Sequence, residues 1–174
     1  MKIEIPDKYF NSEELENTPE RIQRFYKEWF TEAEEDFKFT TFKSKVKGIV
    51  ALQDIPLESI CSHHLLPYKG TCNVIYVPYE GKICGISKLA RTVDKLAHKP
   101  TIQEELTAEI ADFLMEKLQP QGVMITMKCE HQCMSIRGVR KQGMKMCTSE
   151  VRGIFLESCE LRDEAMRLIG LRSD

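Results

Sequence analysis

Apolar residues recur at helical spacing in four parts of the chain, and the residues that flank them are typical of helix ends. Thr18 and Pro19 open the first of these segments. Ser87 and Thr101 are expected to cap the second and third, and Thr101 with Glu104 has the spacing of a capping box. The pattern therefore predicts helices at 18–30, 87–97, 101–118 and 161–169.

Six other segments have the β-branched, aromatic or alternating character of strands, at 46–57, 71–79, 82–86, 122–128, 132–139 and 146–156. The turn at Glu80 and Gly81 predicts that its two flanking strands pair as a hairpin. Strands in this order predict an antiparallel β-sheet, with the two central helices packed on one face. The expected fold class is α+β, with a further helix at each end of the chain.

Length and composition fit one main domain over residues 46–174, preceded by a short helical arm over residues 1–45. The 174 residues are 42% hydrophobic and 30% charged, an ordinary globular balance. A net charge of −2 gives no reason to expect nucleic acid or an acidic membrane as a partner, and no apolar run is long enough to span a bilayer. The N-terminal segment has no secretory signal pattern, so we expect a cytoplasmic location.

Cysteine and histidine change this picture. The seven cysteines are an odd number, which favours burial or metal binding over a disulfide framework. Three of the four histidines lie in two short segments, CSHH at 61–64 and HQC at 131–133. The spacing of Cys61 and His64 predicts a turn, because a regular strand would point these two side chains to opposite faces. His131 and Cys133 are two residues apart and are expected to share one face of a strand.

Cys61, His64 and Cys133 would give one ion three protein ligands and an open fourth position. Two thiolates and an imidazole favour zinc, and an open position favours a catalytic ion. Two other ligand sets remain open. A closed structural site would add His131, and Cys129 has a C-x3-C spacing with Cys133. A single buried Cys or His is more often a core residue than a ligand, but two clusters that contain most of the histidines favour the metal.

The segments CSHHLLPYKG, GISKLARTVDKLAHKPTIQEELT and EHQCMSIRGVRK resemble the GTP cyclohydrolase I family in order and spacing, over about residues 47–170. A weaker similarity covers TPERIQRFYKEWF. The resemblance implies a T-fold (tunnelling-fold) subunit, with pentameric rings that pair as a homo-decamer and active sites at subunit interfaces. It also implies conversion of GTP and water into 7,8-dihydroneopterin triphosphate and formate.

The resemblance assigns roles to individual residues. It implies zinc ligands at Cys61, His64 and Cys133, and acid–base roles for His63 and His131, since imidazole titrates near neutrality. The residues that it implies as substrate contacts are Gln103 and Glu104 for guanine, Ser87, Lys88, Arg91 and Arg137 for the triphosphate, and the basic positions Arg24 and Arg21 of the first helix.

Physical reasons support part of this assignment. Lys88 and Arg91 share one face at a predicted helix N-terminus, where free N–H groups and the helix dipole favour anions. A carboxylate at Glu104 can accept from the N1–H and the exocyclic amine of guanine, although the expected capping box explains Glu104 equally well.

One position departs from the family pattern, because Ser62 replaces the glutamate that usually follows the first cysteine. The loss affects the proton network beside the ion and leaves the ligands intact. Two rival functions are a relative that acts on another pterin or 7-deazaguanine precursor, and a non-catalytic zinc- or nucleotide-binding module. The combination of the three ligands with the Gln103–Glu104 pair favours the cyclohydrolase. Glu150 and Arg152 replace small or apolar residues for no reason visible in the sequence.

Overall fold

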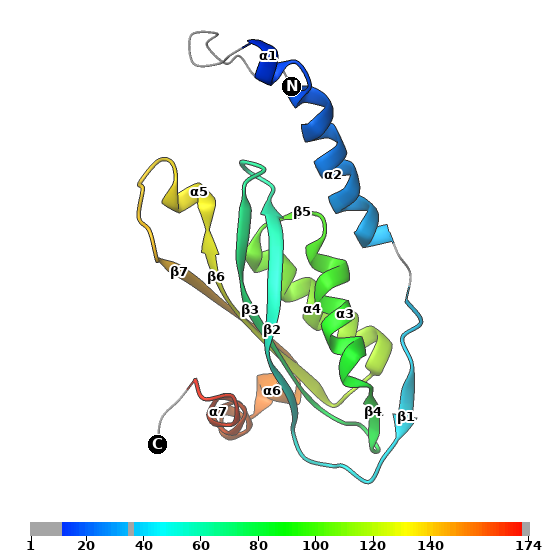
Figure 1. Ribbon diagram of the computed structural model, residues 1–174. Coiled ribbons are helices and arrows are strands. Elements are labelled where there is room, and N and C mark those ends of the chain that lie inside the picture. Colours follow the sequence, from blue (N-terminus) through cyan, green and yellow to red (C-terminus); the bar gives the residue numbers. More distant parts are fainter. Residues whose placement is uncertain (1–11, 35–36, 172–174) are drawn as a thin grey trace.

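A computed structural model describes residues 12–34 and 37–171 of the chain (Figure 1). The helices within these ranges are α1 (Ser12–Leu15), α2 (Thr18–Glu34), α3 (Ile86–Ala97), α4 (Gln103–Leu118), α5 (Gln132–Ser135), α6 (Ile154–Glu157) and α7 (Cys159–Leu168). The strands are β1 (Thr41–Lys43), β2 (Val50–Cys61), β3 (Pro67–Val77), β4 (Lys82–Cys84), β5 (Pro100–Thr101), β6 (Gly122–His131) and β7 (Lys145–Gly153).

Five strands form the main sheet in the order β5-β2-β3-β6-β7. All neighbours run antiparallel except β5, which pairs parallel with the end of β2. The expected α+β class with a largely antiparallel sheet is therefore confirmed.

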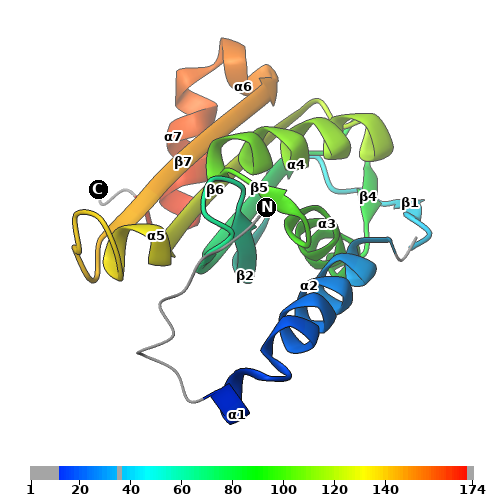
Figure 2. The same ribbon diagram turned by 90° about the horizontal axis from the view of Figure 1, so that it is seen from above.

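Helices α3 and α4 cover one face of the sheet, as Figure 2 shows from above. The larger core lies between them and the sheet, and it includes the fully buried Leu89, Val93, Leu106, Ile110 and Leu114. A smaller core forms on the opposite face, where α6 and α7 cover the lower part of the sheet around Ile75, Met124, Phe155 and Ala165. The expected pair of helices on one face is thus confirmed, and the C-terminal helix lies on the other.

The predicted hairpin between the segments 71–79 and 82–86 is wrong. Strand β3 is flanked by β2 and β6, so it has no free edge for β4. The turn at Glu80 and Gly81 instead directs β4 to β1. Gly81 has φ of 72°, and a Cβ there would lie 2.0 Å from the carbonyl oxygen of Ser44. This close approach of two backbone segments requires glycine.

The predicted strand at 132–139 is also wrong. Pairing of β3 with β6 ends at Tyr68 and His131, and the chain then turns into α5 and a loop. Cys133 therefore lies on a short helix, and it does not share a strand face with His131.

Two predicted helix caps are wrong as well. The N-cap of α3 is Gly85 and that of α4 is Ile102, and neither makes a side-chain capping bond. Thr101 is unavailable as a cap because it belongs to β5 and pairs with Cys61. Ser87 consequently lies inside the first turn of its helix. Among the helices in the described ranges, none has the length and apolar character needed to cross a bilayer.

Candidate metal centre and substrate pocket

The turn predicted between Cys61 and His64 is present at the end of β2. The Cys61 N–H donates to the carbonyl of Leu66 at 2.9 Å, and the Leu65 N–H donates to the carbonyl of Cys61 at 2.8 Å. Leu65 takes a left-handed conformation, with φ of 52°, to close this turn. The tight turn lets residues three apart in sequence present their side chains to one point.

Cys133 reaches this turn from a distant segment. The register of β3 and β6 places His131 opposite Tyr68, so α5 begins beside the turn. The two sulfurs and one imidazole nitrogen of Cys61, His64 and Cys133 all lie within 4.8 Å of one another. Neither His131 nor Cys129 belongs to this group of potential ligands.

The geometry and chemistry of this group fit a metal ion. Zinc bonds of about 2.0–2.3 Å require ligand atoms roughly 3.5–4 Å apart, so small side-chain adjustments suffice. Burial raises the pKa of the Cys133 thiol, and the neighbouring Cys61 raises it further. Two thiols this close oppose each other's ionisation, and a divalent cation between them would remove that opposition.

Arg137 and His63 lie next to the three potential ligands. Arg137 Nη1 donates to His64 Nε2 at 2.8 Å, since a guanidinium can only donate. The ring of His63 is exposed and perpendicular to that of His64, with 6.2 Å between the ring centroids. A cation and a second imidazole therefore adjoin the cluster.

His131 lies at the end of β6 in a tightly packed environment. Its ring stacks on Tyr68, with centroids 4.5 Å apart and an interplanar angle of 8°. Its Nε2 is 2.9 Å from Oε1 of Gln103, a side chain with no solvent exposure. Burial lowers the pKa of His131, while the charge of the nearby Glu104 opposes that shift. Glu104 itself is exposed.

An open pocket of about 700 Å³ lies between α2 and the Cys61 turn. Tyr26 holds the two parts together, because its hydroxyl donates to the carbonyl of Leu65 at 3.1 Å. Arg21 lines this pocket together with His63 and His64. Arg24 is not among the lining residues; its exposed side chain lies 3.9 Å from that of Glu28. The structure thus places Arg21, and not Arg24, beside the histidines.

Three of the expected phosphate contacts lie elsewhere. Ser87, Lys88 and Arg91 lie in the N-terminal half of α3, which begins beside β4, whereas the C-terminal end of α3 leads to β5, which pairs with Cys61 (Figure 1). The length of α3, about 18 Å for its 12 residues, separates these ends. Within one chain the structure does not bring these residues to the potential metal ligands.

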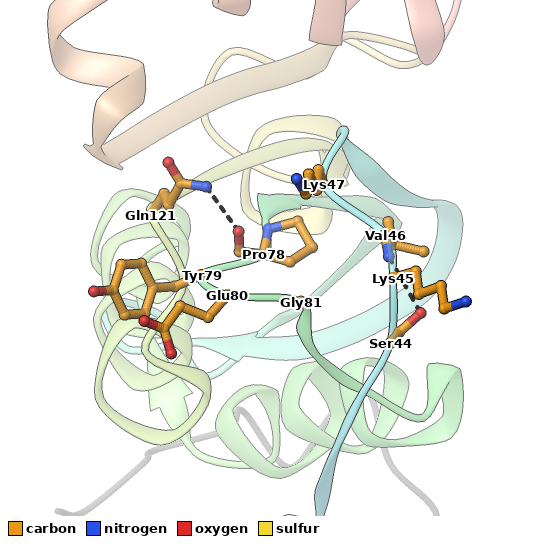
Figure 3. A pocket seen from close by; sticks show the side chains of 9 residues that line it. All are labelled: Ser44, Lys45, Val46, Lys47, Pro78, Tyr79, Glu80, Gly81 and Gln121. Carbon is orange, nitrogen blue, oxygen red and sulfur yellow. Dashed lines mark hydrogen bonds between the residues drawn. The ribbon is translucent and has the colours of Figure 1, made fainter.

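A second pocket has a volume of about 440 Å³, and Figure 3 shows the residues that line it. It is formed by the segments around β1 and β4, and Gln121 Nε2 donates to the carbonyl of Pro78 at its edge, at 2.8 Å. None of the candidate site residues lines it.

Sequence reasoning missed two contacts. Tyr68, which stacks on His131, follows the CSHH segment closely, but only the register of β3 and β6 pairs the two residues. Arg152 connects β7 to α4, donating to Asp112 at 2.7 Å and to Glu150 at 2.6 Å. Hydrogen bonds to these carboxylates raise the pKa of Arg152. The two charged residues that the sequence left unexplained therefore form one ion-pair cluster.

The curled sheet, the paired helices and the three-ligand cluster define a T-fold protein with a candidate metal centre. A solved structure of the archaeosine synthase QueF-Like in the apo form has a similar fold, with a TM-score of 0.50. The two share 20% sequence identity, and the match covers 63% of this chain and 97% of that one. At this identity the similarity concerns the fold alone.

The chain belongs to the GTP cyclohydrolase I family, whose sequence profile matches residues 3–170. GTP cyclohydrolase 1 of Carboxydothermus hydrogenoformans is 47% identical over 173 residues, covering 98% of this chain and 88% of that protein. The enzyme of Geobacillus kaustophilus is 44% identical over 162 residues, covering 91% and 86%. A Listeria monocytogenes relative of the same name is 43% identical over 169 residues, covering 95% and 87%.

Proposed function

We propose that this protein is a zinc-dependent GTP cyclohydrolase I that converts GTP and water into 7,8-dihydroneopterin triphosphate and formate. The observation that carries the proposal is the convergence of Cys61, His64 and Cys133 within 4.8 Å, in a chain of this family. We further propose that residues 46–174 form the catalytic T-fold, that residues 1–45 form a helical arm, and that the protein acts in the cytoplasm.

Cys61, His64 and Cys133 would hold the zinc ion and leave one position open. When bound, zinc in such a site lowers the pKa of water enough to supply hydroxide near neutral pH, which suits hydrolysis at C8 of the purine. His63 is adjacent to His64 and His131 is two residues from Cys133, and imidazoles there can transfer protons to and from the ring nitrogens as bonds break.

The guanine end of the substrate is assigned to Gln103 and Glu104, with Glu104 as the direct contact. The exposed carboxylate of Glu104 is free to accept from N1–H and the exocyclic amine, a pair of donors that adenine lacks. The buried side chain of Gln103 lies behind it, against His131. Arg137, Arg21 and Arg24 are assigned to the triphosphate, whose binding would position C8 beside the three potential ligands.

Ser87, Lys88 and Arg91 complete the triphosphate site only if a second copy of the chain supplies them. The length of α3 separates them from the metal cluster of their own chain. We therefore propose a homo-oligomer with active sites between subunits, assembled as two pentameric rings.

Charges on the sheet support a head-to-tail arrangement of the copies. The register pairs Glu58 with Lys69, Lys69 with Glu130, and Glu130 with Lys145. This row alternates in sign across β2, β3, β6 and β7, and paired residues share one face. It ends in an acid on β2, outside the short pairing of β2 with β5, and in a base on the edge strand β7. Like edges would repel and unlike edges attract, which favours a closed ring over a two-fold dimer.

A turnover assay tests the proposed function. The zinc-loaded protein is incubated with GTP, the product is oxidised, and neopterin fluorescence and formate are measured with and without a chelator. We expect both products in about equal amounts, and loss of both after chelation. Zinc-loaded protein that binds GTP and yields neither product would contradict the proposal and favour a non-catalytic module.

A further inference from the structure

A buried chain of hydrogen bonds runs behind His131 and connects α4 with β6 and β7. Its centre is the side chain of Gln103, which has no solvent exposure. Gln103 Oε1 faces His131 Nε2 at 2.9 Å, and Gln103 Nε2 lies 3.2 Å from the carbonyl of Met146 and 3.0 Å from the hydroxyl of Thr148. The direction of each bond follows from which atoms are able to donate.

The Met146 carbonyl fixes the orientation of the Gln103 amide. A backbone carbonyl can only accept, so the atom of Gln103 that faces it must be the amide nitrogen. The opposite orientation would place two acceptors together inside the protein, at the cost of an unsatisfied buried group.

A second path along the chain gives the same orientation. The Thr107 hydroxyl lies 2.6 Å from the carbonyl of Gln103, which can only accept, so Thr107 uses its single hydrogen there. The Thr148 hydroxyl, 2.7 Å from that of Thr107, must then donate to Thr107. Thr148 has no hydrogen left, so it accepts from the Gln103 amide nitrogen.

Both paths leave the Gln103 oxygen facing His131, so the neutral imidazole must carry its hydrogen on Nε2. The lone pair is then on Nδ1, and stacking on Tyr68 holds the plane of the ring. We propose that Gln103 is a positioning residue that holds His131 in the Nε2–H tautomer, so that Nδ1 is the nitrogen that exchanges protons during GTP hydrolysis. The assignment of the tautomer depends only on the hydrogen bonds, whereas the role of His131 in catalysis rests on the proposed function.

This inference differs from a direct contact of the Gln103 side chain with guanine. Both hydrogens of its amide nitrogen are used inside the chain, by Met146 and Thr148. Its oxygen is used by His131. A direct guanine contact would make Gln103 contribute to the KM for GTP, whereas a positioning role makes it contribute mainly to kcat.

Nitrogen NMR tests the tautomer directly. The zinc-loaded full chain, labelled with ¹⁵N-histidine, is studied by magic-angle-spinning NMR at pH 8, where neutral imidazole dominates. The chain has four histidines, so comparison with His131→Ala assigns the signals of His131. We expect a protonated Nε2 and an unprotonated Nδ1 in the wild-type protein. A protonated Nδ1 would overturn the inference without any change to Gln103.

Two variants test the role of Gln103. Gln103→Met has a similar volume and no acceptor, so we expect a mixture of tautomers, a fall in kcat of about tenfold and a change in KM below about twofold. Gln103→Glu keeps an oxygen toward His131, and its buried carboxyl can donate its proton to the Met146 carbonyl, so it should retain Nε2–H and recover most of kcat. Zinc content and circular dichroism establish that each variant is folded. An unchanged tautomer in Gln103→Met, or a loss seen only in KM, would refute the positioning role. If Gln103→Met does not fold, the wild-type NMR spectrum still tests the tautomer, and the kcat of Gln103→Glu still tests the role of the Gln103 oxygen.

Discussion

The two ends of α3 differ in how completely one chain builds its part of the site. At the C-terminal end, Cys61, His64 and Cys133 converge within 4.8 Å, and Arg137 and His131 are fixed beside them by hydrogen bonds. In the N-terminal half of α3, Ser87 and Arg91 are exposed, and no side chain caps the helix. The metal end is thus ordered within one chain, whereas the other end is exposed and uncapped.

The difference follows from what each end must do. Metal ligands must be held in position before the ion arrives, because the ordering of loose side chains would weaken its binding. An uncapped helix N-terminus with basic residues is unfavourable by itself, since the dipole opposes positive charge there. The arrangement becomes favourable when a phosphate group binds. The neighbouring Ile86, at 71% exposure, also leaves apolar surface for a second subunit to cover.

The largest effect is expected from removal of a ligand at the metal end. Cys133→Ser should lose zinc and reduce kcat by at least about a hundredfold, because a hydroxyl replaces a thiolate ligand. The matched control is Cys159→Ser, which changes an exposed cysteine at the start of α7 and should retain both the zinc and the wild-type kcat. Zinc analysis and formate release measure the result, and zinc retention by Cys133→Ser would exclude Cys133 as a ligand.

A change at the phosphate end should be smaller and of a different kind. Arg91→Ala should keep its zinc and lower kcat/KM for GTP by about ten- to a hundredfold, the value of one charge-assisted hydrogen bond. Lys117→Ala on α4 is the control, since Lys117 is paired with the adjacent Glu116. Steady-state kinetics at low GTP concentration measures the effect. An Arg91→Ala enzyme with wild-type kcat/KM would remove Arg91 from the site.

The two arginines of α2 sharpen the comparison further. Arg21 lines the pocket with His63 and His64, whereas the side chain of Arg24 is 71% exposed. We expect Arg21→Ala to raise the KM for GTP about fivefold or more, and Arg24→Ala to raise it less, because Arg24 does not line the pocket and lies close to Glu28. The same kinetic assay ranks the two. The reverse order would show that the oligomer, and not the single chain, sets their positions.

The smallest effect concerns stability at alkaline pH. Cys129 is fully buried on β6, and burial raises the pKa of its thiol to about 12. The unfolded chain releases this proton near pH 9, so the folded state is favoured below that pH and loses this advantage as pH rises toward 12. The thermal midpoint should therefore fall above pH 9, and less steeply in Cys129→Ala. If the thermal midpoint falls equally steeply with pH in the two proteins, the raised pKa of Cys129 would be contradicted.

The spacing of Cys61 and His64, two of the three potential metal ligands, was informative because it has a local cause. A cysteine and a histidine three apart fit a turn, and the turn at Cys61 is present. The reason that Cys133 joins them was not local. It depends on the register of β3 with β6 and on the change from strand to helix after His131, which the alternating pattern of 132–139 concealed.

Tertiary pairing explains the other differences from the sequence predictions. Thr101 is a residue type that often caps helices, but here it belongs to β5 and pairs with Cys61. Strand β4 follows a turn typical of hairpins, but it cannot pair with β3 because β2 and β6 occupy both edges of β3. Local signals also placed Ser87 and Lys88 correctly in the first turn of a helix, with Arg91 one turn further on. They could not reveal that this turn lies at the far end of the helix from the metal cluster.

The central claim is that one active site needs the metal end of one chain and the phosphate end of another. Mixing Cys133→Ser with Arg91→Ala, by co-expression or by dissociation and reassembly, tests it directly at low GTP concentration. If the ends come from different chains, random assembly leaves about a quarter of the sites intact, and activity should rise to about a quarter of wild type. Activity that stays at the mean of the two separate variants would show that each chain builds its own site, and would contradict the account.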